Sequence, residues 1–292
     1  MAKIAVAYKA QREHGGVERT PAPPAACRLA SGDGWTVSDV VCTAGPQNKP
    51  FEEQHTGTAI AIVVSGTFQY RSSAGRELMT PGSFLLGNVG ECFTCEHEHG
   101  TGDRCVSFLF TPEFFEELAY ESGARRVRFR VPRLPPIRVL APLVARASAL
   151  LTGAEPAVGE ELAIHVAAKA IQIARGIGPS RTCADASSLA RVTRVVRMID
   201  SQSANPHTLS SLAQMARLSQ YHFLRTFEGL TGTTPHQYLL RARLRNAAVR
   251  LRKEPTKILE IALGCGFGDV SNFNRTFRAE FGVCPRKYRS MA

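Results

Sequence analysis

The chain has 292 residues, of which 44% are hydrophobic, and it carries a formal net charge of +11 at pH 7. This length suits two domains with a connector, and eight cysteines spread over both halves do not indicate a disulfide framework. The N-terminus lacks the apolar run of a signal peptide, and no segment is long and apolar enough to span a membrane. These features exclude a membrane protein and predict a soluble, cytoplasmic one.

The first part of the chain is predicted to be rich in β-strands to about residue 110. Runs of β-branched and aromatic residues at 58–64, 67–71, 83–87 and 105–110 are separated by turns that contain glycine. Short strands at near-regular spacing are typical of a sandwich or a small barrel. We therefore expect an N-terminal β-domain over residues 1–132.

Cysteine and histidine are concentrated in one segment of this β-domain. The candidate metal ligands are Cys92, Cys95, His97, His99 and Cys105. Mixed sulfur and imidazole ligands favour zinc or another transition metal, and His55 on an earlier segment can approach the same site. The spacing matches no zinc-finger pattern, so a redox-sensing thiol pair and simple packing stay open as alternatives.

Two helices are predicted between the β-rich part and the end of the chain. Residues 137–151 and 159–175 place apolar side chains at helical spacing, and the second helix is apolar around much of its surface. Such helices need a partner surface, which is either the β-domain or a second copy of the chain. We expect residues 133–184 to form a helical connector, with a linker rich in Gly, Pro and Ser at 176–188.

Almost all of the net positive charge lies in the last part of the chain. Residues 185–292 hold 17 Lys and Arg against 7 Asp and Glu, a net charge of +10, whereas residues 1–184 are nearly neutral. Basic side chains that neutralise phosphates release condensed counterions and supply most of the sequence-independent affinity for DNA. A merely solvated basic face is the alternative.

This basic part also contains one structural unit twice. The recurring residues are Phe223, Arg225, Thr226, Phe227, Gly232, Pro235 and Tyr238, followed 50 residues later by Phe273, Arg275, Thr276, Phe277, Gly282, Pro285 and Tyr288. Each unit has a short helix, a turn and a second helix, which is the helix-turn-helix pattern. Ser219 and Asp269 are expected to cap the second helices, and Gly232 to end the first of them. A basic helix over residues 237–253 is expected to link the two units rigidly.

These residues resemble the C-terminal domain of AraC-type (AraC/XylS family) transcription regulators. The family signature runs through Ile261-Ala262, Gly266-Phe267, Phe273, Phe277, Gly282, Pro285 and Tyr288-Arg289. The resemblance covers roughly a third of the chain and implies that the second helix of each unit enters the major groove of promoter DNA, with RNA polymerase as a further partner. The earlier strands resemble the cupin-like domain that precedes the DNA-binding half in many such regulators.

The resemblance assigns DNA contacts to the outward faces of the two second helices. The candidate DNA-binding residues are Gln220, Tyr221, Leu224, Arg225, Ser271, Asn272, Asn274 and Arg275. Arginine can pair with guanine and asparagine with adenine, each pair discriminating by roughly 1–3 kcal/mol. Leu224 suits contact with a thymine methyl group, and Arg225 and Arg275 have phosphate contact as their alternative.

The sequence thus predicts an α+β multidomain protein: an N-terminal cupin-like β-barrel or sandwich, a helical connector and a C-terminal all-α double helix-turn-helix at 185–292. We expect a dimeric, non-enzymatic transcription regulator controlled by a small-molecule effector or by a metal or thiol signal. The alternatives are a cupin-type metalloenzyme tethered to DNA and a non-specific DNA-bending protein. Nothing in the sequence identifies the effector, the target site or the direction of control.

Overall fold

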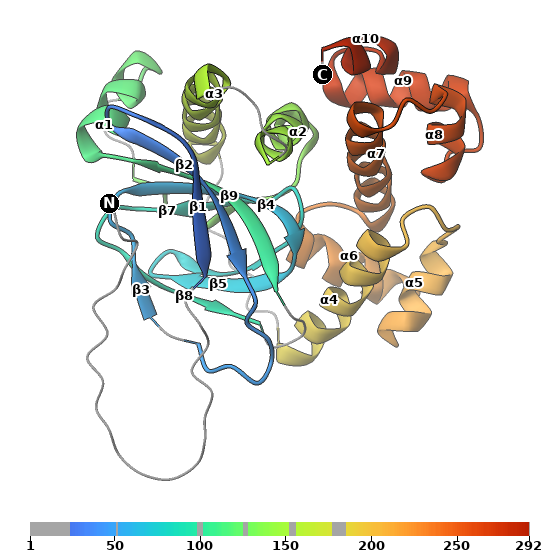
Figure 1. The fold of residues 1–292 in the computed structure, drawn as a ribbon. Helices are drawn as coiled ribbons and strands as arrows, with labels where there is room; N and C mark the ends of the chain where they lie inside the picture. Colours follow the sequence, from blue (N-terminus) through green and yellow to red (C-terminus); the bar gives the residue numbers. More distant parts are fainter. Residues whose placement is uncertain are drawn as a thin grey trace.

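The computed structural model describes residues 24–50, 52–97, 102–124, 128–151, 156–176 and 185–291. A β-rich part and a helical part lie side by side, with α2 and α3 over the β-rich part (Figure 1). The strands are β1 (Ala25–Gly32), β2 (Trp35–Cys42), β3 (Glu52–Gln54), β4 (Thr58–Gly66), β5 (Phe68–Ser72), β6 (Gly75–Met79), β7 (Phe84–Gly87), β8 (Cys92–Glu96), β9 (Asp103–Phe110) and β10 (Arg133–Leu134). The helices before the helical part are α1 (Pro112–Glu121), the short 3-10 helix η1 (Arg138–Leu140), α2 (Ala141–Leu150) and α3 (Pro156–Ala174).

The strands form two antiparallel sheets, which confirms the predicted β-rich N-terminal fold. The six-stranded sheet has the order β1-β2-β9-β4-β7-β10, and the four-stranded sheet has the order β3-β8-β5-β6. The first six residues of β4 are all buried, because β4 lies between β9 and β7 and is covered on both faces. A strand buried on both faces needs an unbroken apolar run, which is the pattern that predicted it. β10 extends the larger sheet by pairing with β7.

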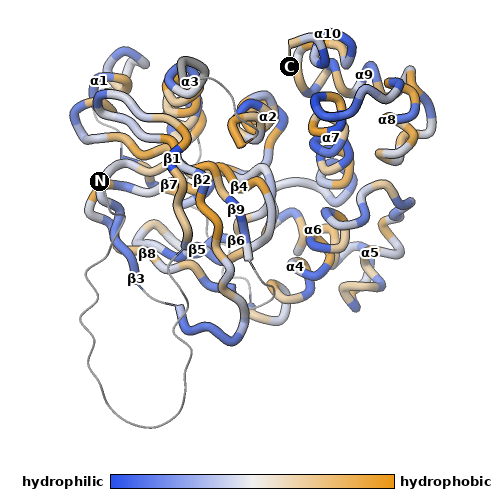
Figure 2. The backbone as a smooth tube through the Cα atoms, in the orientation of Figure 1, coloured by the Kyte–Doolittle hydropathy of each residue, from blue (hydrophilic) through white to orange (hydrophobic). Residues whose placement is uncertain are grey.

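Two hydrophobic cores stabilise the β-rich part. One lies between the six-stranded sheet and helices α1, α2 and α3, and the other lies between the two sheets. The buried members of the second core are Ala61, Val63, Phe68, Tyr70, Met79, Leu85 and Cys105. Full burial of one large apolar side chain contributes about 1.5–3 kcal/mol. Figure 2 shows hydrophobic residues along the central strands and on α2 and α3.

The connector helices pack on the larger sheet. The predicted helix over 137–151 is divided into η1 and α2, and α3 begins three residues before the predicted start at residue 159. In α3, Gly159 allows a close approach to β1, because a Cβ atom there would lie 2.6 Å from the Cβ of Ala30. Buried residues of α2 and α3, such as Ala147 and Ala167, belong to the core of the larger sheet. An intrachain surface therefore covers these helices, and a dimer interface stays a prediction.

The helical part consists of seven helices among the described residues. They are α4 (Ala186–Ser201), α5 (Leu209–Ala216), α6 (Gln220–Thr231), α7 (Pro235–Lys253), α8 (Ile258–Gly264), α9 (Val270–Phe281) and α10 (Pro285–Ser290). Helices α4 to α6 form the first unit, α8 to α10 form the second, and α7 runs between them (Figure 1). The 19 residues of α7 give it a length of about 28 Å.

The repeated residues have the structural roles that their spacing predicted. Ser219 and Asp269 cap α6 and α9 by accepting hydrogen bonds from backbone N–H groups three residues later. Gly232 and Gly282 end these helices in the left-handed conformation, with φ of 75° and 77°. Each second helix buries its phenylalanine face, with Phe223 and Phe227 in the core of the first unit and their counterparts in the core of the second.

The β-rich part contacts the first unit through buried groups. Arg133 pairs with Glu77 of β6 at 2.9 Å, and both side chains are less than a tenth exposed. The same guanidinium donates a hydrogen bond of 3.0 Å to the carbonyl of Thr231, the last residue of α6. Leu78 of β6 joins the hydrophobic core of the first unit.

The second unit is held by the segment that follows β10. Arg138 of η1 donates a hydrogen bond of 2.7 Å to the carbonyl of Ala279, in the last turn of α9. Ala141 and Ala145 of α2 pack against the core of the second unit. Together with the contact of Arg133, these contacts fix both units against the β-rich part at the C-terminal ends of α6 and α9.

Candidate functional site

The outward face at the start of α6 carries the first group of predicted DNA-binding residues. Gln220, Tyr221 and Arg225 are exposed, Tyr221 to 67%. Arg225 donates a hydrogen bond of 3.1 Å to the Tyr221 hydroxyl, and its guanidinium lies 5.9 Å from the centre of the Tyr221 ring. Leu224 is half-buried. The geometry therefore couples Tyr221 and Arg225 into one polar group beside an apolar position.

The corresponding face of α9 is more polar. Ser271, Asn272, Asn274 and Arg275 are all exposed. Arg275 donates a hydrogen bond of 3.2 Å to the side-chain oxygen of Asn272. Asn274 has no side-chain hydrogen bond among the described residues. Its amide is thus available without breaking an intrachain contact, and an amide that is both donor and acceptor suits the edge of adenine.

The arginines of α7 differ in the contacts that they make within the chain. Four of them make intrachain contacts: Arg241 with Glu280 (3.2 Å), Arg243 with the carbonyl of Ser203 (2.7 Å), Arg245 with Asp200 (3.0 Å) and Arg250 with Glu254 (2.9 Å). The first three contacts brace α7 against its neighbours, whereas the fourth lies within the end of α7 itself, because Glu254 is its C-cap residue. Arg252 and Lys253, at the end of the helix, are exposed and add positive charge there, and the side chain of Arg252 also forms a hydrogen bond with Tyr288.

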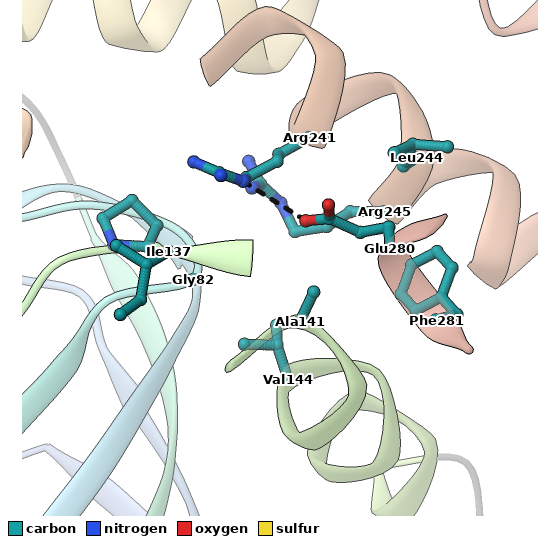
Figure 3. Close-up of a pocket in the computed structure, with 10 residues that line it drawn as sticks. Gly82, Ile137, Ala141, Val144, Arg241, Leu244, Arg245, Glu280 and Phe281 are labelled. Atoms are coloured by element: carbon teal, nitrogen blue, oxygen red, sulfur yellow. Dashed lines mark hydrogen bonds and ion pairs between the residues drawn. The ribbon is translucent and has the colours of Figure 1, made fainter. Parts of the chain in front are cut away.

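A small cleft lies where α2, α7, α9 and the β-rich part meet. It is lined by apolar residues of α2 and by the Arg241–Glu280 pair (Figure 3). The buried Nη1 atom of Arg241 has no hydrogen-bond partner among the described residues. Burial raises the pKa of Glu280, and the positive charge of Arg241 opposes this change.

The structure brings the predicted ligands Cys95 and Cys105 close enough to interact electrostatically, whereas Cys92 interacts with Glu52 instead. Cys92 is exposed at the start of β8, whereas Cys95 is half-buried and Cys105 is buried. His97 is buried directly after β8, and His99 lies outside the described residues. His55 is also elsewhere: its Nε2 atom lies 2.8 Å from the Tyr70 hydroxyl oxygen, so it belongs to a different hydrogen-bonded group.

His97 is brought together with two residues that the sequence pattern did not indicate. Ligand atoms of Cys42, His97 and Asp103 all lie within 4.8 Å of one another, and His97 Nε2 lies 2.6 Å from Asp103 Oδ1. Burial lowers the pKa of His97, but the hydrogen bonds with Asp103 and Cys42 outweigh this effect and raise it to about 9. Burial, and then the charge of Asp103, raises the pKa of the Cys95 and Cys105 thiols.

Cys42 and Asp103 were not among the predicted ligands, and they could have been found only from strand pairing. Cys42 and Asp103 are far apart in the sequence, but the antiparallel pairing of β2 with β9 places them directly opposite each other. The pattern of cysteine and histidine along one segment carries no information about such a partner. The one local signal was the position of Asp103, two residues before the predicted strand 105–110.

Comparisons with known proteins identify the helical part. A helix-turn-helix domain family matches residues 212–291. The transcriptional activator RhaS of Escherichia fergusonii is 33% identical over 105 residues, which are 36% of this chain and 38% of that protein. The activator RclR of Escherichia coli, described as RCS-specific, is 32% identical over 99 residues, which are 34% of this chain and 35% of that protein.

A solved structure matches the same part. It is a transcriptional regulator with an AraC-type DNA-binding domain from Chromobacterium violaceum, 29% identical, covering 37% of this chain and 96% of that chain with a TM-score of 0.35. The chain spans about a third of the length of the curated relatives that it matches. No described helix is long and apolar enough to cross a membrane. The family match and the identities to curated regulators confirm the resemblance read from the repeat: residues 212–291 form an AraC-type helix-turn-helix DNA-binding domain.

Proposed function

We propose that the whole chain is a sequence-specific transcription regulator, in which α6 and α9 read promoter DNA and the β-rich part receives a signal. The observation that carries this proposal is the exposure of equivalent faces on the two helices. Arg225 and Arg275 occupy the same position in the repeat, and both are exposed. Arginine is the side chain that most often makes a specific contact with guanine.

The arrangement of the helical part supports readout by both units. The length of α7, about 28 Å from its 19 residues, is close to one turn of DNA, about 34 Å. Two units joined by such a helix can address successive major grooves on one face of the duplex. The polar face of α9 supplies most of the base discrimination, and the apolar position of Leu224 suits a thymine methyl group.

The β-rich part is proposed to sense an effector, and the full chain to act as a homodimer with RNA polymerase as a further partner. The contacts of Arg133 and Arg138 with the ends of α6 and α9 support a route for the signal. The curated relatives are transcription regulators, which favours regulation over an enzymatic activity tethered to DNA. In this proposal the β-rich part is a cupin-like domain.

The test begins with footprinting on the DNA that flanks the protein's own coding region. Arg275→Ala is then expected to weaken binding to the protected site by roughly 1–3 kcal/mol and to relax preference at one base pair. Lys253→Ala is the matched control, because it removes the same charge from the exposed end of α7, and it should weaken all sequences alike.

Two results would contradict this proposal. Equal loss of affinity by Arg275→Ala for the protected site and for random DNA would mean that this arginine contacts phosphate. Strong binding by the wild-type protein without any site preference would favour a non-specific DNA-bending protein. In both cases affinity is compared at one fixed salt concentration, because phosphate contacts make binding strongly dependent on salt.

A further inference from the structure

Cys42, His97 and Asp103 bring three kinds of metal-binding side chain to one buried point of the β-rich part. Cys42 ends β2, His97 directly follows β8, and Asp103 begins β9. The two sheets therefore both contribute, and the β2–β9 pairing fixes Cys42 opposite Asp103. We propose that these three side chains bind one divalent transition-metal ion of the zinc class.

The distances suit such an ion after a small movement. In a tetrahedral zinc site, with bonds of about 2.0–2.3 Å, neighbouring ligand atoms lie about 3.3–3.8 Å apart. The three ligand atoms here lie within 4.8 Å of one another. His97 Nε2 and Asp103 Oδ1 are closer, at 2.6 Å, because the proton of a hydrogen bond lies between them. A metal ion that replaces this proton would move the two side chains apart by roughly 1 Å.

The charges of the three ligands match a divalent cation. A thiolate from Cys42 and a carboxylate from Asp103 balance the two positive charges, and a neutral His97 adds none. Neutrality matters here, because the side chains of His97 and Asp103 are only 3% and 7% exposed, and an unbalanced buried charge is costly. Sulfur and imidazole ligands select transition metals over magnesium and calcium, which prefer oxygen.

Neighbouring side chains hold the ligands in place. Cys105 donates a hydrogen bond from Sγ to Asp103 Oδ2, at 3.4 Å. The ring of Phe68 stacks on the His97 ring with their centres 5.8 Å apart. Such outer partners orient metal ligands and raise affinity. Three protein ligands also leave the fourth tetrahedral position for water or another small ligand.

The site lies close to the contact with the DNA-binding part. His97 and Thr67 line one small hollow together with Thr193 of α4, and Arg197 of α4 donates a hydrogen bond of 2.9 Å to Thr67. Phe68 stacks on His97 and directly follows Thr67. A movement of His97 on metal binding would therefore reach α4 through Phe68 and Thr67. This consequence rests on the proposed function, whereas metal binding itself does not.

The test uses the reduced, full-length protein after metal removal with a chelator. Titration with Co²⁺ alone, followed by the thiolate-to-cobalt absorption band, is expected to give one equivalent per chain, and Zn²⁺ should displace the cobalt. Cys42→Ala and Asp103→Asn should each lower the affinity at least 100-fold. Cys105→Ala should lower it about 10-fold, as expected for an outer partner.

Cys92→Ala is the matched control, because Cys92 is an exposed cysteine in the neighbouring strand β8, and it should bind Co²⁺ as the wild type does. Far-UV circular dichroism checks that each variant is folded. The proposed site is overturned if the wild-type protein binds no stoichiometric cobalt, or if it binds cobalt without a thiolate band. This result needs no variant. Unchanged affinity in folded Cys42→Ala, or loss of binding in Cys92→Ala, overturns the ligand assignment.

The regulatory consequence is measured separately, as DNA affinity of the wild type with and without Zn²⁺. A change that is absent in Cys42→Ala supports transmission to α4. Metal binding with unchanged DNA affinity overturns transmission. Failure of the proposed function is a different result, because the protein would then bind cobalt but show no site-specific DNA binding under either condition.

Discussion

Gly232→Ala and Gly282→Ala form a matched pair that measures the contact between the β-rich part and the first helix-turn-helix unit. Both glycines end the second helix of their unit, with φ of 75° and 77°, so alanine costs about 1–2 kcal/mol at either position. Only Gly232 faces a neighbour: an added Cβ atom would lie 2.4 Å from the Cβ of Pro135, whereas nothing lies within 4 Å of one at Gly282.

The rigid proline ring cannot yield easily, so the collision should add the usual overpacking cost of about 1–3 kcal/mol. We expect Gly282→Ala to lower the free energy of unfolding by about 1–2 kcal/mol and Gly232→Ala by about 2–5 kcal/mol. Urea denaturation gives both values, with circular dichroism following the helices and the fluorescence of Trp35, the single tryptophan, following the β-rich part. Equal losses in the two variants would refute the packing of Pro135 on Gly232.

Three further predictions concern buried and capping groups. Burial lowers the pKa of His55 from 6.5 to about 4, with the charge of Glu91 opposing this change. As the pH falls, His55 therefore binds a proton in the unfolded chain before it does so in the folded chain. Stability should therefore be full above pH 6.5 and fall on the order of 3 kcal/mol toward pH 4, and urea titrations of His55→Gln should lack this fall. Arg133→Met leaves Glu77 buried without its partner and should cost about 3–5 kcal/mol in the same assay, most of which the double variant with Glu77→Gln recovers. Asp269→Ala removes the cap of α9 and should cost about 1 kcal/mol of stability, with loss of affinity for the footprinted DNA site measured by titration.

The helical part could be predicted closely because its signals are local. Each cap, each terminal glycine and each phenylalanine stripe acts within one or two turns of helix, and each of these signals occurs in both copies of the repeat. Ser219 and Gly232 therefore have the predicted roles. The prediction of the connector was less accurate, since α2 begins only at Ala141, with Pro142 in its first turn, and proline favours the start of a helix. Helix α1 was not predicted, because its short amphipathic pattern adjoins a strand.

The two candidate sites differ in how far sequence could define them. The candidate DNA-binding residues lie on one face of α6 or α9, so spacing alone places Asn274 and Arg275 at the surface. The metal-binding group is assembled by strand pairing across the fold, and spacing along one segment could not show that Cys42 meets His97. Chemical composition drew attention to this region, since His97 is among the predicted ligands, whereas only the register of β2 with β9 shows that Cys42 lies opposite Asp103.

The contacts at the ends of α6 and α9 limit how a signal can act under the proposed function. Arg133 and Arg138 are five residues apart, and each donates to a carbonyl in the last turn of one of these helices. The carbonyls at a helix C-terminus carry partial negative charge, which favours a nearby guanidinium. Because the residues that face DNA lie toward the other end and are exposed, docking does not cover them. A shift of this short segment would thus change the orientation of both helices together, so control by orientation fits the structure better than control by uncovering a blocked surface.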